Sequence, residues 1–201
     1  MTQPKSPRTP TVRKLTVTAM LGAVATVLMF ISFNVPLMPS FIKLDLSELP
    51  ALIASFALGP LWGVCVCLIK NLINVFFSTT GGVGELSNFI LGASFVFTAG
   101  MFYKHMGGRK GALIGSLCGA AAMAIISVFS NYFVVYPVYT AFMPMDVILS
   151  LYQAINPNVK NLWDALLWFN MPFTFIKGML SVIITFLIYK KLSPLLKGRN
   201  A

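Results

Sequence analysis

LPALIASFALGPLWGVCVCLIKNLINVFF, residues 49–77, is the stretch that decides how many helices this chain forms. Its length allows either one long apolar helix or two shorter ones. Gly59-Pro60 favours two, because proline has no amide hydrogen and excludes the residue before it from helical geometry. The first helix, Leu49–Leu58, would then cover only about 15 Å of a bilayer core that is roughly 30 Å thick.

The composition of the chain indicates a lipid environment. Of the 201 residues, 57% are hydrophobic and 10% are charged, and the mean hydropathy is +0.82. A soluble domain of this size would expose large apolar patches, so we expect an integral membrane protein. Four further stretches, one of them with its flanking residues, are long enough for membrane helices: Leu15–Val35, Phe89–Phe102, Ala112–Tyr136 and Met171–Tyr189.

The distribution of charge favours two crossings within residues 49–77. All five acids then lie on one side of the membrane, and the basic clusters within 5–14, 104–110 and 190–199 lie on the other. Positively charged flanks resist translocation, so the basic side is cytoplasmic. We therefore predict an all-α integral membrane protein with six transmembrane helices and cytoplasmic N- and C-termini. Residues 1–14 and 197–201 would be tails, and 15–196 the six-helix domain.

The same rule accounts for the net charge of +10 without nucleic-acid binding, because the basic residues form short groups and no nucleic-acid motif accompanies them.

The predicted second helix is too short to cross the membrane by itself. The external loop before it, Pro36–Glu48, is the candidate segment for the rest of the crossing. Irregular backbone at membrane depth is tolerated only where it is buried in protein or lines a cavity. We expect this loop to close over a site like a lid.

Residues suited to catalysis are scarce. His105 is the only histidine and lies in a basic loop, and the sequence contains no HExxH motif and no phosphate-binding loop. The three cysteines lie in apolar stretches without metal-site spacing. We predict no catalytic residues, no metal and no resident cofactor, so any energy input must come from a partner.

Polar residues inside apolar helices are the remaining signal, because burying such groups in a membrane is costly and often marks a functional interior. Thr174 and Lys177 are three residues apart and share a helix face, with Asn170 one turn before Thr174. Asn131 offers both a donor and an acceptor. The alternative is that these groups only bond neighbouring helices. Lys70 is more ambiguous, since it could simply neutralise Asp45 or Glu48.

Aromatic residues accompany this polar set. They could cover the faces of a flat ring, although the usual preference of aromatic side chains for the membrane interface accounts for about half of them. They lie around Asn131 and Thr174: Phe129, Tyr132, Phe133, Tyr136, Trp168, Phe169, Phe173 and Phe175.

Six motifs, in register along residues 15–196, resemble the riboflavin-specific S component of ECF-type vitamin transporters. They are KLDLSELP (43–50), LGP (58–60), IKN (69–71), GVGELSN (82–88), NYF (131–133) and PFTFIKG (172–178). The resemblance implies a multi-pass protein of the prokaryotic plasma membrane that captures riboflavin from outside. It also implies docking to a transmembrane coupling subunit that carries two cytoplasmic ATPase subunits.

The resemblance also implies roles for particular residues. The partner-binding face maps to Ala19 and Ala23, although such a pair of small residues could also serve internal packing. Thr174 stands where the family commonly has asparagine, which leaves the hydrogen-bond pattern to the flavin open. The residues expected to contact riboflavin are Leu46, Glu85, Asn88, Asn131, Asn170, Thr174 and Lys177.

Two other classes compete with this interpretation. A self-sufficient secondary carrier for a small aromatic vitamin or related flavin would want an Asp, Glu or His in the middle of a span, and the sequence places none there. A small intramembrane enzyme would need a nucleophile paired with a base, which the chain lacks.

Overall fold

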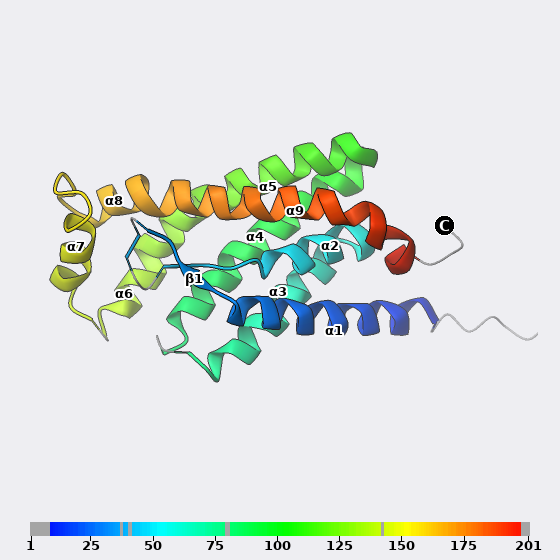
Figure 1. Cartoon of the computed structure of the whole chain (residues 1–201), viewed down its shortest axis with the longest axis horizontal. Helices are drawn as coiled ribbons and strands as arrows, with labels where there is room; N and C mark the ends of the chain where they lie inside the picture. Colours follow the sequence, from blue (N-terminus) through cyan, green and yellow to red (C-terminus); the bar gives the residue numbers. More distant parts are fainter. Residues whose placement is uncertain (1–8, 37, 40–41, 79–80, 142, 198–201) are drawn as a thin grey trace, which may run out of the picture.

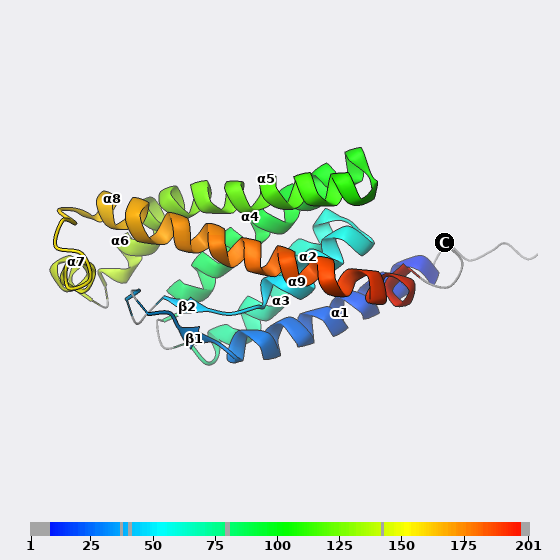
Figure 2. The same ribbon diagram turned by 45° about the horizontal axis from the view of Figure 1, so that its top comes forward.

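Long helices run along the length of an elongated bundle in the computed structural model, which describes residues 9–36, 38–39, 42–78, 81–141 and 143–197 (Figure 1). The first is α1 (Thr9–Phe30), followed by a two-stranded antiparallel hairpin of β1 (Phe33–Asn34) and β2 (Lys43–Leu44). The predicted first helix therefore ends at Phe30, five residues earlier than expected. Figure 2 shows the hairpin lying beside α9.

The remaining elements follow in chain order: α2 (Glu48–Leu58), α3 (Pro60–Val75), α4 (Val83–Met106), α5 (Gly108–Ser130), η1 (Asn131–Val135), α6 (Tyr136–Tyr139), α7 (Met145–Gln153), α8 (Leu162–Ala165), η2 (Leu166–Asn170) and α9 (Met171–Lys197). The elements η1 and η2 are π-helical turns that join their neighbours into longer helices.

Four helical segments of the described chain are long and apolar enough to cross a membrane: Val12–Phe30, Val83–Met106, Gly108–Tyr139 and Leu162–Ile188. They correspond to the four apolar stretches predicted from the sequence. The last begins at Leu162 rather than Met171, because α8 and η2 extend it ahead of the predicted stretch. The two shorter apolar helices, α2 and α3, occupy residues 49–77.

The break between α2 and α3 falls at the predicted position. Gly59 has φ +116°, a conformation that L side chains rarely adopt, and Pro60 is the first residue of α3. At the next turn, a Cβ on Gly63 would lie 2.8 Å from the carbonyl oxygen of Ala51 and 2.7 Å from Cβ of Ser55. The two short helices therefore pack backbone against backbone.

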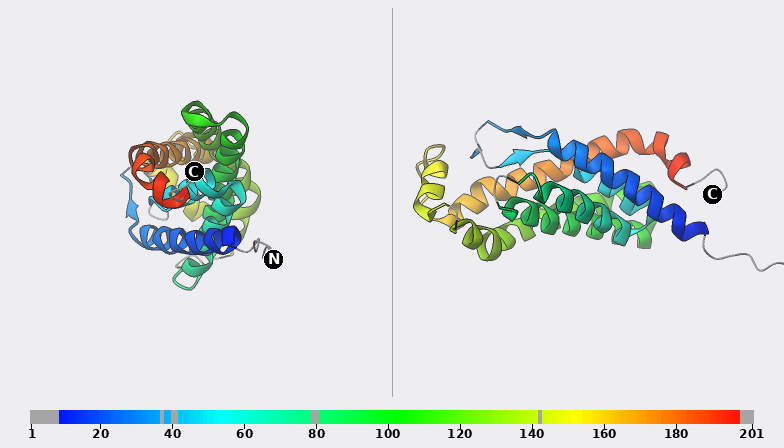
Figure 3. Two further views of the ribbon diagram at one scale, coloured as in Figure 1. Left: turned by 90° about the vertical axis from the view of Figure 1, so that its right-hand side faces the viewer. Right: turned by 90° about the horizontal axis from the view of Figure 1, so that it is seen from below.

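Helix α2 is the centre of the bundle. All residues from Glu48 to Phe56 are buried, and α2 contacts α1, α3, α4 and α9. Viewed end-on, it lies between the longer helices (Figure 3, left). A helix of 11 residues is tolerated here because its ends and sides meet protein rather than lipid.

The two ends of the bundle differ in the segments they carry. The start of α1, the turn from α4 to α5 and the end of α9 lie at one end, and α7 and the hairpin lie toward the other (Figures 1 and 3). The turn from α4 to α5 carries the basic residues Lys104, Arg109 and Lys110. The end with α7 carries Asp146 and Asp164.

The close approach of α2 and α3 yields a stability prediction. Gly63→Val should lower the free energy of unfolding by about 2 kcal/mol, because its methyl groups would overlap the α2 backbone. Cys65→Val, on the same helix but exposed, is the matched control and should have little effect. Thermal unfolding of the detergent-solubilised protein measures both. Equal melting temperatures for the two variants would contradict the inferred packing.

Candidate functional site

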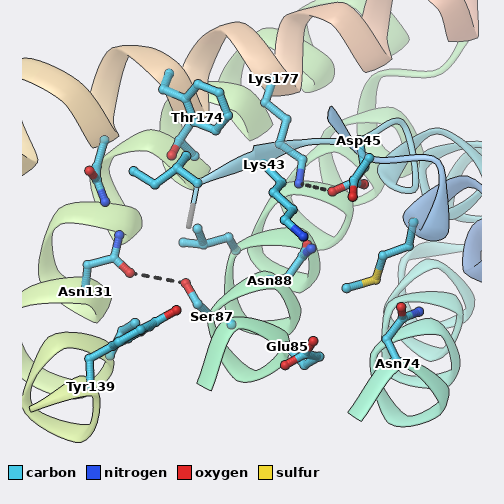
Figure 4. A pocket seen from close by; sticks show the side chains of 18 of the residues that line it. Lys43, Asp45, Asn74, Glu85, Ser87, Asn88, Asn131, Tyr139, Thr174 and Lys177 are labelled. Atoms are coloured by element: carbon cyan, nitrogen blue, oxygen red, sulfur yellow. Dashed lines mark hydrogen bonds and ion pairs between the residues drawn. The ribbon is translucent and has the colours of Figure 1, made fainter. Parts of the chain in front are cut away.

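A cavity of about 870 Å³ opens at the end of the bundle away from the basic α4–α5 turn, and Figure 4 shows the side chains around it. Its walls come from α1, from the hairpin, from α3, α4, α5, α6 and α7, from the two π-helical turns and from α9. The polar residues of the wall are Ser32, Asn34, Lys43, Asp45, Asn74, Glu85, Ser87, Asn88, Asn131, Tyr136, Tyr139, Asn170, Thr174 and Lys177.

Each π-helical turn places a buried asparagine in this wall. Asn131 is the first residue of η1, and Asn170 is the last residue of η2. A π turn holds one residue more than an α turn, and such turns are frequent at functional sites. The Oδ1 atom of Asn131 accepts a hydrogen bond from the Ser87 hydroxyl at 3.2 Å, whereas its Nδ2 atom has no acceptor among the described residues. That amide hydrogen-bond donor is free for a ligand.

Asn170 belongs to a hydrogen-bonded cluster with two tyrosines. The Tyr152 hydroxyl donates to Oδ1 of Asn170 at 2.7 Å and lies 2.5 Å from the Tyr136 hydroxyl. Burial raises the pKa of Tyr152, which lies on α7, so its hydroxyl stays a donor at neutral pH. The sequence did not indicate these tyrosines as partners, and they fix the orientation of Asn170.

Lys177 on α9 forms a buried ion pair with Asp45, which lies between β2 and α2. The distance from Nζ to Oδ2 is 2.9 Å (Figure 4). Burial alone would raise the pKa of Asp45, but Lys177, assisted by Lys70 and the Ser47 hydroxyl, outweighs it and holds this pKa well below its ordinary value of 3.8. Asp45 is therefore charged at neutral pH. The sequence indicated Lys177 but not this partner.

A second buried ion pair lies next to the first. Lys70 Nζ is 2.7 Å from Oε1 of Glu48, and both side chains are fully buried. Lys70 also donates to the Ser47 hydroxyl at 2.5 Å and to Oδ1 of Asn88 at 3.4 Å. Ser47 in turn donates to Asp45 through its hydroxyl and its amide. The suggestion that Lys70 neutralises an acid of the preceding loop is thus confirmed for Glu48.

The cavity brings together most of the predicted ligand-contacting residues. Glu85, Asn88, Asn131, Asn170, Thr174 and Lys177 all line it. Leu46, which is half-buried, is not among the residues that line the cavity. Glu85 accepts a hydrogen bond from the Ser78 hydroxyl at 2.6 Å.

The aromatic residues divide between cavity and surface. Of the predicted set, Tyr136 and Phe173 line the cavity, whereas Phe129, Phe133 and Trp168 are exposed on the outside of the bundle. Phe30, Phe77 and Tyr139 line the cavity as well and were not singled out from the sequence. Only the fold brings them to the site.

Ala19 and Ala23 are exposed on α1, whereas the neighbouring Gly22 is buried and meets Ile69 of α3. The described residues contain no group of three or more His, Cys, Asp or Glu side chains arranged to hold a metal ion.

The tyrosine cluster yields a second prediction. Tyr152→Phe should lower the free energy of unfolding by about 1–2 kcal/mol, because it leaves Oδ1 of Asn170 buried without this donor. Tyr132→Phe removes the hydroxyl of an exposed tyrosine and is the control. Thermal unfolding in detergent compares them, and an unchanged melting temperature for Tyr152→Phe would show that the cluster adds no stability.

Comparison with known proteins agrees with this arrangement. The family model described as ECF transporter, substrate-specific component, matches residues 13–189. The riboflavin transporter RibU of Staphylococcus aureus (strain TCH60) is 37% identical over 185 residues, covering 92% of this chain and 93% of the relative. The riboflavin transporter FmnP of Bacillus subtilis (strain 168) is 33% identical over 195 residues, covering 94% and 97%.

A solved structure described as "Structure and mechanism of the S component of a bacterial ECF transporter" has the same fold. It superposes with a TM-score of 0.74 and 34% sequence identity, and the match covers 94% of this chain and 99% of that one. The family match spans nearly the whole helical bundle, including every element that lines the cavity. This chain therefore belongs to the substrate-specific components of ECF transporters.

Proposed function

We propose that this chain is the riboflavin-binding membrane subunit of an ECF transporter and that the cavity is its vitamin site. The observation that carries the proposal is the set of buried polar side chains, Asn131, Thr174 and Lys177, that converge on the cavity wall from two helices. They belong to a chain whose relatives are named riboflavin transporters.

The size and chemistry of the cavity suit such a ligand. About 870 Å³ falls within the range of roughly 300–1,000 Å³ that is common for small-molecule sites. The free amide donor of Asn131, the Thr174 hydroxyl and the Lys177 ammonium can pair with the ring nitrogens and carbonyl oxygens of an isoalloxazine. Tyr136, Tyr139 and Phe173 supply apolar surface for its faces. Binding needs no covalent step.

The membrane topology that we propose has six crossings, four by the long helices and two by α2 and α3. The ends of the bundle support this topology. The basic α4–α5 turn lies at the same end as the start of α1 and the end of α9, and positive charge gathered at one end is typical of a cytoplasmic side. The cavity then faces outward. Ile42, Lys43 and Asp45, which belong to the predicted lid, line one of its sides; residues 37 and 40–41 of that loop lie outside the described part.

Coupling to ATP hydrolysis would come from partner subunits. The exposed Ala19 and Ala23 on α1 allow close approach of a helix of the transmembrane coupling subunit, which we expect to carry two cytoplasmic ATPases. A self-sufficient carrier is the competing class. It would need a carboxylate free to exchange protons, whereas the two buried acids of the described chain are both ion-paired to lysines.

Riboflavin binding by the isolated protein is the direct test. Lys177→Ala should weaken binding in detergent at least tenfold, because it removes a charged hydrogen-bond donor from the cavity wall. Lys160→Ala, an exposed lysine outside the cavity, is the matched control. Isothermal titration calorimetry on flavin-free protein measures both. Absence of heat from the unmodified protein with any flavin would refute the function, and unchanged affinity of Lys177→Ala would exclude Lys177 from the site.

A separate experiment addresses the partner. Ala19→Leu/Ala23→Leu should abolish riboflavin uptake by cells or by reconstituted complexes, because bulky side chains keep the coupling helix at a distance. Riboflavin affinity of the isolated variant should be unchanged, since both positions lie outside the cavity. Liposomes that contain only the unmodified chain should not accumulate riboflavin. Uptake by those liposomes would favour a self-sufficient carrier.

A further inference from the structure

We infer that Asp45 is a positioning residue of this site: its carboxylate fixes the ammonium group of Lys177 at the cavity wall, and riboflavin affinity depends on it through that lysine. This inference rests on the proposed function. Asp45 and Lys177 are 132 residues apart in the chain, and both are buried. The fold therefore brings them together only when the chain ahead of α2 is seated against α9.

The ion pair leaves most of the hydrogen-bonding capacity of Lys177 unused. An ammonium group has three N–H donors, and Asp45 is the one partner that Nζ has among the described residues. Since Lys177 also lines the cavity, the remaining donors are available to a molecule bound there. Figure 4 shows the two side chains meeting at the edge of the cavity, with Lys43 nearby.

The side chain of Asp45 is itself held in place by hydrogen bonds to the carboxylate oxygen that is not paired with Lys177. Its Oδ1 atom accepts hydrogen bonds from the amide and the hydroxyl of Ser47, the amide at 2.9 Å. The Ser47 hydroxyl accepts from Lys70, which is anchored by its ion pair with Glu48. The carboxylate therefore has one orientation, in which Oδ2 faces Lys177. This chain of contacts ties the lysine to the buried start of α2.

Such fixation bears on affinity in two ways. A lysine side chain has four rotatable bonds, and holding it before the ligand arrives lowers the entropy lost on binding. A buried ammonium is also costly without a paired negative charge, so the ion pair with Asp45 stabilises Lys177 at the cavity wall. The other acid of the cavity wall, Glu85, is hydrogen-bonded to Ser78, and Asp45 is the acid that is ion-paired with Lys177.

A double-mutant cycle tests the inference. Asp45→Asn should weaken riboflavin binding at least tenfold in the unmodified protein but less than about threefold in the Lys177→Ala background. Asp146→Asn, an exposed carboxylate on α7, is the matched control and should bind normally. Calorimetry gives the affinities, and gel filtration with thermal unfolding checks that each variant is folded.

Ser47→Ala provides an independent arm that leaves both charges in place. It should weaken riboflavin binding at least threefold when Lys177 is present and have no effect in the Lys177→Ala background. If Asp45→Asn does not fold, this variant tests whether Asp45 positions Lys177. Unchanged affinity of Asp45→Asn, or equal losses with and without Lys177, would overturn the positioning role. If the unmodified protein binds no flavin, the proposed function fails instead, so the two failures are distinguishable.

Discussion

The structure depends on the burial of two carboxylates where the chain enters α2. Asp45 and Glu48 are both shielded from solvent, and an unpaired buried charge would cost several kcal/mol. Lys177 from α9 and Lys70 from α3 neutralise them, and the Ser47 hydroxyl bridges the two pairs. These contacts fix where the segment ahead of α2 runs, and so they set one wall of the cavity.

Close packing of the short helix α2 acts together with these ion pairs. An 11-residue helix can sit in the middle of the bundle because glycines on its neighbours allow the backbones to approach. Gly63 of α3 meets the α2 backbone, and Gly92 of α4 leaves room for the Glu48 carboxylate, whose Oε2 atom would lie 2.5 Å from a Cβ at that position. Packing and electrostatics therefore hold the same helix, and both would be disturbed by side chains larger than hydrogen at these glycines.

Much of this arrangement is readable from residue pattern alone. The Gly59-Pro60 break, the four long apolar helices and the buried polar faces around Asn131 and Thr174 follow from local rules of helix geometry and burial cost. The partner of Lys177 did not follow, because Asp45 is remote in sequence and lies in an irregular segment. The hydrogen bonds of Tyr136 and Tyr152 with Asn170 were also missed, since only the tertiary structure brings these side chains from α6 and α7 to η2. Leu46 was predicted from resemblance and does not line the cavity.

The two π-helical turns have a consequence for the helices that contain them. One additional residue in a turn rotates everything beyond it by roughly 100° relative to a continuous α-helix. In the segment from Gly108 to Tyr139, the part before Asn131 can thus keep its small residues against α4, while the part after it presents Val135 and Tyr136 to the cavity. The change of helix face at each π-helical turn therefore lets one helix pack against a neighbouring helix along one part and line the cavity along another.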